Sequence, residues 1–408
     1  MSAIAVIGLQ YGDEGKGRLV DYLSQSVSAV IRYQGGDNAG HTVKVGDTVH
    51  KLHSIPSGIL RPDVDNIIGA GCVVNPTALM KEIKTLRDSG VSCDNLYVSD
   101  KAHVVMPYHI TLDRAYEQLQ MIGTTCRGIG PCYVDKVARR GIRIGDLSDL
   151  KTVEAKVSFT LASYVNPLLT AWGYPKTYTV EEVMAEVRTW VLPERFTDTI
   201  NPDLYDVLLE GQLGVMKDLD HGIYPMVTSS NTLPGYAAVG AGVAPTKVIG
   251  VAKAYVTSVG GGAFPTEMFD EEAVRLRTLG HEFGATTGRP RGCGWLDLVA
   301  LRHAVQLTGC TSICLTKVDV LDTYDTIQVC VAYQDAQGKT LNYVPYDMST
   351  VTPVYETFKG WKCDTTQCRK FSDLPVEARI YIDYIECLTR VSVGYVSVGA
   401  EREALIVR

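Results

Sequence analysis

The chain has 408 residues, of which 46% are hydrophobic and 21% are charged, and it contains 38 glycines and 17 prolines. This composition is that of a globular protein, and it excludes collagen-like, disordered and coiled-coil classes. The formal net charge of −7 argues against a nucleic-acid-binding surface and against a polybasic membrane anchor. Any polyanion must therefore be bound by a local cluster of cations, backbone amides and metal.

The first hundred residues alternate apolar runs with helical patterns, which predicts right-handed βαβ units and a largely parallel sheet. The expected strands are 3–8, 29–33, 66–69 and 96–98, and the expected helices are 16–23 and 76–86.

The rest of the chain continues this pattern after an interruption. Residues 151–205 are more polar, have helical spacing and contain three prolines, so we expect a helical excursion from the sheet. Further strands are expected at 208–210, 248–257 and 312–316, and a helix at 295–307. Because no linker or repeat divides the sequence, we expect a single α/β domain over residues 1–408.

The cysteines and the apolar runs bear on location. The 11 cysteines are odd in number, scattered and without a CxxC pair, and no signal peptide is recognisable, so a reducing cytoplasm is favoured. Cys310 and Cys314 are expected to be buried as small hydrophobic residues. No apolar run approaches the length of about 18 residues that a membrane span requires.

A glycine-rich segment, Gly8 to Gly17, stands between the first strand and the first helix. Such a turn directs backbone N–H groups and a helix N-terminus at an anion, and Lys16 would add a point charge on phosphates. The segment is not a standard P-loop, because Gly17 stands where Ser or Thr would hold Mg²⁺. Asp13 is then the candidate metal ligand. The alternative is a glycine-rich turn with a solvated lysine.

The strand expected at 312–316 ends in Thr316-Lys317-Val318-Asp319. This pattern is typical of guanine recognition, in which the carboxylate accepts from N1–H and the 2-amino group while the lysine stem covers the ring. Adenine does not present this pair of donors, so the motif favours GTP over ATP.

Three further loops combine glycine with cations or hydroxyl groups. Segment 32–42 ends a strand, where open α/β sheets bind ligands, and it carries His41, a candidate general acid or phosphate partner. Segments 123–130 and 135–140 suit a second phosphate-bearing ligand. In segment 284–291, two arginines can bind a carboxylate, and the loop is expected to close over a substrate. The alternative for each is an exposed loop.

Together these segments resemble the adenylosuccinate synthetase family, whose enzymes join aspartate to IMP with the use of GTP. The resemblance runs from about residue 3 to residue 406, and residues 151–205 are least alike. It rests on GDEGKG, NAGHT, IPSG, GTTCRGIGP, DKVARRG, VTSSNT, EFGATTGR, GWLD and TKVDVLD, which occur in the order of the family. It implies a P-loop NTPase-like α/β fold with a large, mostly parallel central sheet flanked by helices.

The resemblance also implies a reaction. GTP phosphorylates the 6-oxygen of IMP, and the amine of aspartate then displaces the phosphate. Asp13, His41 and Lys16 would be catalytic, with Asp13 as the base for the purine N1 proton and His41 as the acid in phosphoryl transfer. Asp13 and the carbonyl of Gly40 would bind Mg²⁺. Arg139 matches an arginine that reaches the partner's site in a dimer, so a homodimer is implied.

The remaining roles follow from the same match. The GTP site would comprise Gly12, Gly15, Lys16, Gly17, Gly40, Thr42, Arg291, Lys317, Asp319, Ser397 and Gly399. The nucleotide substrate would contact Asn38, Thr125, Arg139, Leu213, Thr228 and Arg289. The amino-acid substrate would contact Ala285, Thr286, Thr287 and Arg289.

Three departures from the family pattern concern substrate recognition. The family has Glu-Gly-Ala-Gln-Gly where this chain has residues 210–214, so the glutamine expected beside the purine base falls on Leu213. Gln212 stands one place earlier, and a local shift of the backbone could restore the lost contact. Asp37 adds a negative charge near a phosphate site, and Pro290 interrupts the run of arginines.

The expected function is therefore a GTP-dependent ligase of AMP synthesis, with small-molecule substrates and with neither nucleic acid nor membrane as partner. Leu213 and Asp37 keep open a related ligase for another 6-oxopurine nucleotide, such as the viral enzymes that act on dGMP. An alternative of another class is a GTP-binding regulatory switch. The arginine–threonine loop counts against it, since a switch needs no amino-acid site.

Overall fold

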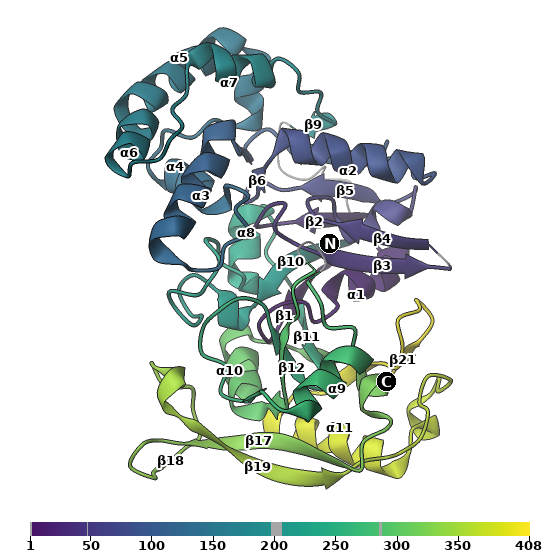
Figure 1. Ribbon diagram of the computed structural model, residues 1–408. Helices are drawn as coiled ribbons and strands as arrows, with labels where there is room; N and C mark the ends of the chain where they lie inside the picture. Colours follow the sequence, from purple (N-terminus) through teal and green to yellow (C-terminus); the bar gives the residue numbers. More distant parts are fainter. Residues whose placement is uncertain (1, 47, 197–205, 285–287) are drawn as a thin grey trace.

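The computed structural model describes residues 2–46, 48–196, 206–284 and 288–408 (Figure 1). Within these residues, a ten-stranded sheet has the order β21-β20-β16-β11-β1-β10-β2-β5-β7-β9. Its strands pair in parallel, except for β20 and β21. In the order of the sheet, the bounds are Leu405–Val407, Val393–Ser397, Ser312–Thr316, Lys247–Lys253, Ser2–Gly8, Asp206–Gly214, Ala29–Arg32, Asp65–Ile68, Leu96–Ser99 and Glu194–Phe196. The expected α/β fold with a large, mostly parallel sheet is confirmed.

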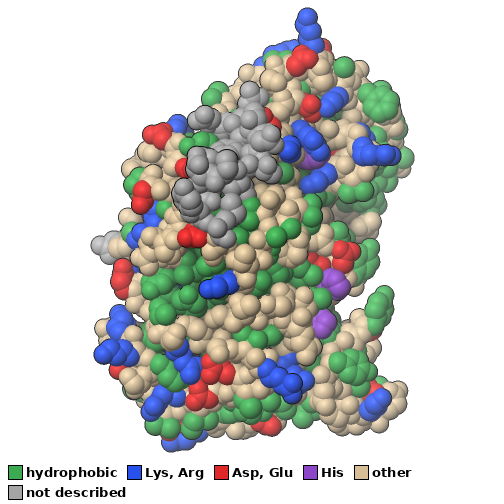
Figure 2. All heavy atoms as spheres, turned by 180° about the vertical axis from the view of Figure 1, so that it is seen from behind, with side chains coloured by type: hydrophobic (Ala, Val, Ile, Leu, Met, Phe, Trp, Pro, Cys, Tyr) green, Lys and Arg blue, Asp and Glu red, His purple; other side chains and the backbone are tan. Residues whose placement is uncertain are grey.

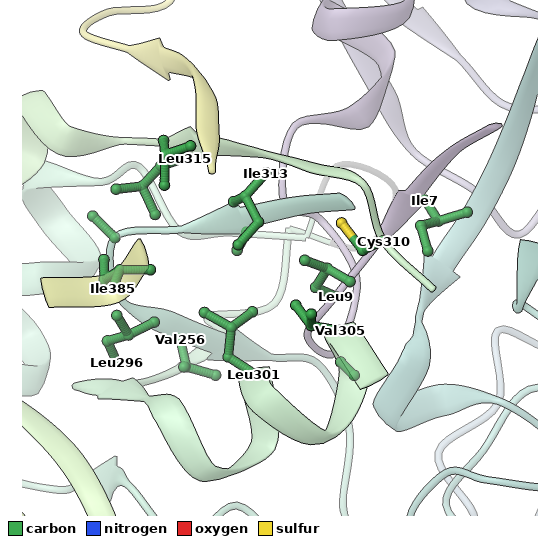
Figure 3. Packing of buried hydrophobic residues seen from close by; sticks show 14 of the residues in the cluster. Ile7, Leu9, Val256, Leu296, Leu301, Val305, Cys310, Ile313, Leu315 and Ile385 are labelled. Carbon is green, nitrogen blue, oxygen red and sulfur yellow. The ribbon is translucent and has the colours of Figure 1, made fainter. Parts of the chain in front are cut away.

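Strand β1 shows how helices cover both faces of the sheet. Its side chains alternate between the faces, as the period of a strand requires. Ala5 and Ile7 lie in the same buried cluster as Leu301 and Val305 of α10 (Leu298–Thr308). Figure 3 shows the side chains of Leu301 and Val305 beneath strands of the central sheet. Val6 instead packs in the cluster that contains residues of α1 (Lys16–Leu23). The strand is buried on both faces, which explains its continuous apolar run.

The other elements surround this sheet. The remaining helices are α2 (Pro76–Asp88), α3 (Pro107–Gln120), α4 (Ile129–Val137), α5 (Leu150–Thr160), α6 (Asn166–Ala171), α7 (Val180–Val187), α8 (Ala237–Gly240), α9 (Glu271–Leu279) and α11 (Val376–Thr389). The shorter strands are β3 (His41–Val45), β4 (Thr48–Leu52), β6 (Val73–Val74), β8 (His103–Val104), β12 (Val256–Ser258), β13 (Glu267–Met268), β14 (Gly292–Gly294), β15 (Leu296–Asp297), β17 (Thr326–Gln334), β18 (Thr340–Leu341) and β19 (Thr352–Lys359).

Three sequence expectations need correction. The strand expected at 248–257 is divided, because β11 ends at Lys253 and β12 pairs with β14 in a separate sheet. The segment 151–205 does contain α5, α6 and α7, but it is not wholly helical, because β9 returns to the central sheet and pairs in parallel with β7. Residues 197–205 lie outside the described residues. The helix expected at 295–307 begins only at Leu298, because the carboxylate of Asp297 accepts a hydrogen bond from the backbone N–H of Ala300 and caps the helix.

Membrane spans and buried cysteines can also be compared with the structure. Among the described residues, no helix combines the length and the apolar character needed to cross a bilayer. Cys310 and Cys314 are buried, as expected. Acidic and basic side chains are both scattered over the face shown in Figure 2. The division of the chain into one domain stays a prediction.

Candidate active site

The glycine-rich segment forms a turn that is held together by a buried acid. Gly12, Asp13 and Gly15 adopt positive φ angles of 107°, 59° and 95°, and Gly15 caps the start of α1. The carboxylate of Glu14 accepts from the backbone N–H of Gly12 (2.7 Å) and from Nζ of Lys16 (2.6 Å). Lys16 is only 2% exposed, so the alternative of a solvated lysine is wrong. The loop is thus preorganised around a buried cation, as an anion site requires.

His41 begins β3 and lies against the carboxyl end of β10. Its Nδ1 is 2.6 Å from Oε1 of Glu210, and the hydroxyl of Ser57 donates to the same oxygen (2.5 Å). Burial lowers the pKa of His41, while the charge of Glu210 opposes this effect. Burial would raise the pKa of Glu210, but His41, Arg32 and Ser57 outweigh burial and lower it. Glu210 therefore stays charged, fixes the orientation of the imidazole and leaves Nε2 as the ring nitrogen for a ligand.

Gln212 does not move into the position of Leu213. Its side-chain oxygen accepts from Arg32 (2.8 Å) and from the N–H of Gly36 (3.1 Å), and its nitrogen donates to Asn38. These bonds tie the amide of Gln212 to the loop after β2, beside Asn38, one of the residues predicted to contact the nucleotide substrate. A contact of Gln212 with the purine base stays a prediction. The side chain of Leu213, which has a φ of 60°, lies beside Gly12 instead.

The added negative charge of Asp37 has a partner. Its carboxylate accepts from Nη1 of Arg127 at 3.0 Å, and its side chain is buried. Burial raises the pKa of Asp37, and Arg127 acts in the opposite direction. The negative charge expected from Asp37 is thus paired with Arg127, which comes from the loop that carries the second phosphate motif.

Asp13 is joined to a buried cluster of charges through Arg291. Nη2 of Arg291 lies 2.7 Å from Asp13, and Nη1 lies 2.5 Å from Glu282. Glu282 also accepts from Lys253 at 2.8 Å and from the hydroxyl of Tyr255 at 2.5 Å. Burial alone would raise the pKa of Glu282, but the surrounding cations lower it to about 2. A chain of alternating charges thus connects the loop of Arg291 to the glycine-rich turn.

The predicted guanine motif lies directly beside this turn. The hydroxyl of Thr316 donates to the carbonyl of Glu14 (2.6 Å), and Nζ of Lys317 donates to the carbonyl of Gly280 (2.7 Å). Oδ1 of Asp319 is buried and accepts no hydrogen bond from the described residues. An orphaned buried carboxylate oxygen is what a site for the N–H groups of guanine would present.

Arg18 brings the C-terminal loop to the same place. Its guanidinium group donates to the hydroxyl of Ser397 and, at 2.6 Å, to the carbonyl of Gly399. It also donates to the carbonyl of Glu401 at 2.5 Å. The two residues expected to complete the guanine site are therefore held against α1.

Several other predicted residues lie on the loops around this region. Gly17 faces His41 so closely that an added Cβ would lie 2.8 Å from the Cβ of the histidine. Gly40 precedes β3, and Thr42 is exposed within it. Thr125 is exposed, and Thr228 is partly buried, with its N–H bonded to the carbonyl of Lys217 (2.9 Å).

The structure does not bring every predicted residue into the cluster. Arg139 is exposed just after α4 and forms no ion pair with the described residues. Arg289 is exposed in the loop that leads to Arg291. Ala285, Thr286 and Thr287, the residues predicted to contact aspartate, lie outside the described residues.

Sequence reasoning missed the residues that support the site. No motif role was assigned to Glu14, Arg18, Glu210, Lys253 and Glu282, although all of them except Lys253 stand inside or beside the motifs. An acid that is buried next to a cationic residue of a loop signals a supporting role, and this burial is seen only in the structure. Their partners are up to 383 residues distant in the sequence, as for Arg18 and Glu401.

Comparison with known proteins finds relatives over the full length of the chain. A family model described as adenylosuccinate synthetase matches residues 5–406. A protein named adenylosuccinate synthetase from Desulfovibrio desulfuricans is 47% identical over 427 residues, which cover 100% of both chains. A protein of the same name from Lysinibacillus sphaericus is 44% identical over 420 residues, which cover 99% of this chain and 97% of the relative.

Two solved structures are also similar. Fully ligated adenylosuccinate synthetase from Plasmodium falciparum aligns with a TM-score of 0.90 at 34% identity and covers 100% of both chains. Succinoaminodeoxyadenylate synthetase of cyanophage S-2L, bound to dGMP and dATP, aligns with a TM-score of 0.61 at 17% identity, over 100% of this chain and 95% of the other, and shows likeness of fold alone. On its sequence motifs, its fold and its full-length relatives, the chain belongs to the adenylosuccinate synthetase family.

Proposed function

We propose that the chain is a GTP-dependent ligase that joins L-aspartate to carbon 6 of IMP and produces adenylosuccinate, GDP and phosphate. Membership of the family over residues 5–406 supports this function. The observation that carries it is that three motifs distant in sequence meet in one hydrogen-bonded cluster. Thr316 binds the glycine-rich turn, and Arg291 joins Asp13.

The buried charges suggest how the residues would act. Asp13 would accept the N1 proton of IMP, which makes the 6-oxygen a nucleophile toward the γ-phosphoryl group of GTP. His41, oriented by Glu210, would donate to the phosphoryl group in transfer, and Lys16 would neutralise charge on the phosphates. The phosphorylated oxygen is then a good leaving group, so the amine of aspartate displaces it as phosphate. Arg291 would have to exchange Asp13 for a substrate before Asp13 accepts the proton.

The residues present fit a magnesium ion. Among the described residues, no group of three or more His, Cys, Asp or Glu side chains is placed to hold a metal. Mg²⁺ is commonly bound by one or two carboxylates together with substrate phosphates, and it prefers hard oxygen ligands. The carboxylate of Asp13 and the carbonyl of Gly40 would supply such ligands beside the phosphates. When bound, the ion would neutralise charge on the transferred phosphoryl group.

The alternatives are less well supported. The similarity to the phage enzyme bound to dGMP is distant, whereas the full-length relatives at 44–47% identity are named adenylosuccinate synthetase. That phage enzyme was captured with dATP as energy donor, whereas Asp319 here offers an unpartnered carboxylate oxygen for guanine. A regulatory switch would not explain the coupling of Asp13 to the arginine loop.

The finer parts of the proposal concern partners and location. The loop of residues 285–287 with Arg289 would bind aspartate, and Asn38, Thr125 and Thr228 would bind the nucleotide 5′-phosphate. Arg139 is exposed and unpaired within the described residues, which suits a contact to the partner's site in a homodimer. The unpaired cysteines suit a reducing cytoplasm.

One assay tests the proposed function. Purified protein is incubated with GTP, Mg²⁺ and aspartate, with IMP, dIMP, GMP or dGMP added in turn, and phosphate and the succinyl product are measured. We expect product from IMP, and we expect the variant Asp13→Asn to bind GTP but not to turn over. Phosphate release that ignores both aspartate and nucleotide would refute the ligase, and product from dGMP but not IMP would replace the substrate.

A further inference from the structure

Lys217 is a buried cation that the mechanism above does not use. It ends the short 3₁₀ helix Val215–Lys217, which directly follows β10, and it is only 8% exposed. Its Nζ donates to the carbonyls of Met226 (3.1 Å) and Gly261 (3.3 Å). These bonds use two of its three N–H donors. Within the described residues Lys217 forms no ion pair, so no counter-ion balances its charge. A buried ammonium group without a counter-ion is costly, which raises the question of what it binds.

The loops around Lys217 are those that carry the predicted contacts to the nucleotide substrate. Its own carbonyl accepts from the N–H of Thr228 at 2.9 Å. Nζ lies 5.8 Å from the ring centroid of Tyr11, the residue that precedes Gly12 in the glycine-rich turn. The loop of Gly261 in turn lies against the loop that contains Thr125, since an added Cβ on Gly123 would be 3.8 Å from the Cα of Gly260. The ammonium group therefore lies where these loops converge at the carboxyl edge of the sheet.

The surroundings of the ammonium group suit a ring better than a phosphate. The ring of Tyr11 lies 5.8 Å from Nζ, and the side chains of Ile223 and Met226 lie next to Gly262, the residue after Gly261. Apolar and aromatic walls with a few directed polar groups are typical of sites for flat organic ligands. Leu213, four residues before Lys217 on the same segment, stands where the family's glutamine would contact the purine base, and it cannot donate a hydrogen bond.

We propose that Lys217 is a specificity-determining residue of the nucleotide-substrate site and that its ammonium group donates a hydrogen bond to a ring nitrogen of the purine base. The inference rests on the proposed function, since it assumes that a purine nucleotide binds here. An ammonium group is a donor only, so its partner must be an acceptor, and the ring nitrogens N3 and N7 are the acceptors of hypoxanthine other than the reacting 6-oxygen. Lys217 would thus replace the donor that Leu213 lacks.

The charge state of Lys217 offers a separate readout. Burial lowers the pKa of Lys217 to about 8. Tyr11, which packs against Lys217, does not become charged in this pH range, because burial raises its pKa well above its ordinary value and keeps it neutral. The carboxylate of Asp218 accepts from the backbone N–H groups of Asp220 (3.0 Å), His221 (3.1 Å) and Thr232 (2.5 Å). Binding that depends on the ammonium group is therefore expected to weaken as the pH rises through about 8.

The test compares Lys217→Met and Lys217→Gln with the matched control Lys247→Met, which removes an exposed lysine at the start of β11. In the full-length enzyme at pH 7, Lys217→Met is expected to raise KM for IMP about tenfold and to change KM for GTP and aspartate by less than about twofold. Lys217→Gln, which keeps a donor but no charge, is expected to lie between. The ratio of variant to wild-type KM for IMP should fall toward one above pH 8.

Nucleotide analogues identify the atom that accepts. If Lys217 binds N7, 7-deaza-IMP raises KM in the wild type but adds no further increase in Lys217→Met, and 3-deaza-IMP gives this result if Lys217 binds N3. The proposal would be overturned if KM for IMP were the same in the wild type and in both variants. It would also be overturned if Lys217→Met raised KM for IMP but neither analogue raised KM in the wild type. If Lys217→Met does not fold, Lys217→Gln and its pH profile decide alone. Absence of any ligation by the wild type would instead refute the proposed function.

Discussion

Glu210 controls the charge of the imidazole that the reaction is proposed to use. Its carboxylate raises the pKa of His41 against the effect of burial, and it also accepts from Ser57. Replacement by glutamine removes this charge, so the pKa of His41 should fall further. We expect Glu210→Gln to lower kcat about a hundredfold and to move the alkaline limb of the kcat profile to lower pH. Steady-state kinetics from pH 5 to 9 measure both effects.

Ser57→Ala is the control for this prediction. It removes a hydrogen bond to the same carboxylate but leaves the charge in place, so the alkaline limb should stay where it is in the wild type. If Glu210→Gln lowers kcat but leaves the alkaline limb at the pH of the wild type, Glu210 does not set the protonation of His41.

Glu282 is the charge on which the buried cluster depends. Its pKa is lowered to about 2, so its contribution to stability is present above its unfolded pKa near 4.5 and is lost as the pH falls toward 2. Glu282→Gln leaves Lys253 and Arg291 buried with less compensation, and we expect a loss of about 3 kcal/mol in the free energy of unfolding at pH 7. Urea denaturation measures this loss, and the difference from wild type should shrink below pH 4.

The exposed pair of Glu181 and Arg188 provides a comparison. Glu181→Gln should leave the free energy of unfolding unchanged at all pH values, because solvent screens the pair. A Glu282→Gln variant as stable as the wild type at pH 7 would mean that the cluster does not depend on this carboxylate.

At the scale of elements, helix α1 connects the proposed phosphate site to the proposed guanine site. Its first turn contains both Lys16 and Arg18, and Arg18 binds the loop of Ser397 and Gly399. We expect Arg18→Met to raise KM for GTP by roughly ten- to hundredfold, because two loop positions lose their anchor, and to change KM for IMP by less than about twofold. Initial rates at varied GTP and at varied IMP distinguish the two.

Arg61→Met is the matched change at the other end of the helix. Arg61 donates to the carbonyl of Asp21 and to the hydroxyl of Ser24, away from the loop of Ser397. The variant Arg61→Met should therefore keep KM for GTP within about twofold of the wild-type value. Equal effects of the two substitutions would indicate a general loosening of α1 rather than a guanine contact.

The elements also show what the sequence can predict. Strand β1, helix α1 and strand β16 lie where the apolar runs and the helical pattern place them, because these signals are local. The pair β17 and β19 and the helix α11 were not predicted, since they lie between the guanine motif and Ser397, where no motif was assigned. The contact of His41 with Glu210 spans 169 residues and depends on which strands are neighbours in the sheet, which no local pattern contains. Thus the glycine-rich turn, the guanine motif and the loop of Arg291 meet, but their supporting acids could not be assigned.

At the scale of the whole molecule, the fold places most thiols in its interior. Cys363 and Cys387 are exposed, Cys126 is partly buried, and the other cysteines are buried. Burial raises the pKa of the Cys314 thiol to about 12, which suppresses its reactive thiolate. We therefore expect Ellman's reagent to modify Cys363 and Cys387 within minutes in the native protein and all 11 cysteines in urea.

The double variant Cys363→Ser with Cys387→Ser should lose the fast phase and keep its activity, because neither residue contacts the site. A fast phase that persists in this variant would reveal access to the buried thiols. The number of fast thiols thus reports on how closed the whole molecule is under native conditions.

The central place of the first strand has a consequence for how the protein is made. Ser2 pairs with Asp206, which follows it by 204 residues, and the other neighbour of β1 lies still later in the chain, from Lys247 to Lys253. At 5–20 residues per second, the ribosome needs roughly 10–40 s to deliver the first of these partners. During that time the apolar strand has neither neighbour, so a nascent chain of this enzyme should be a strong client of chaperones until residues beyond 253 have emerged.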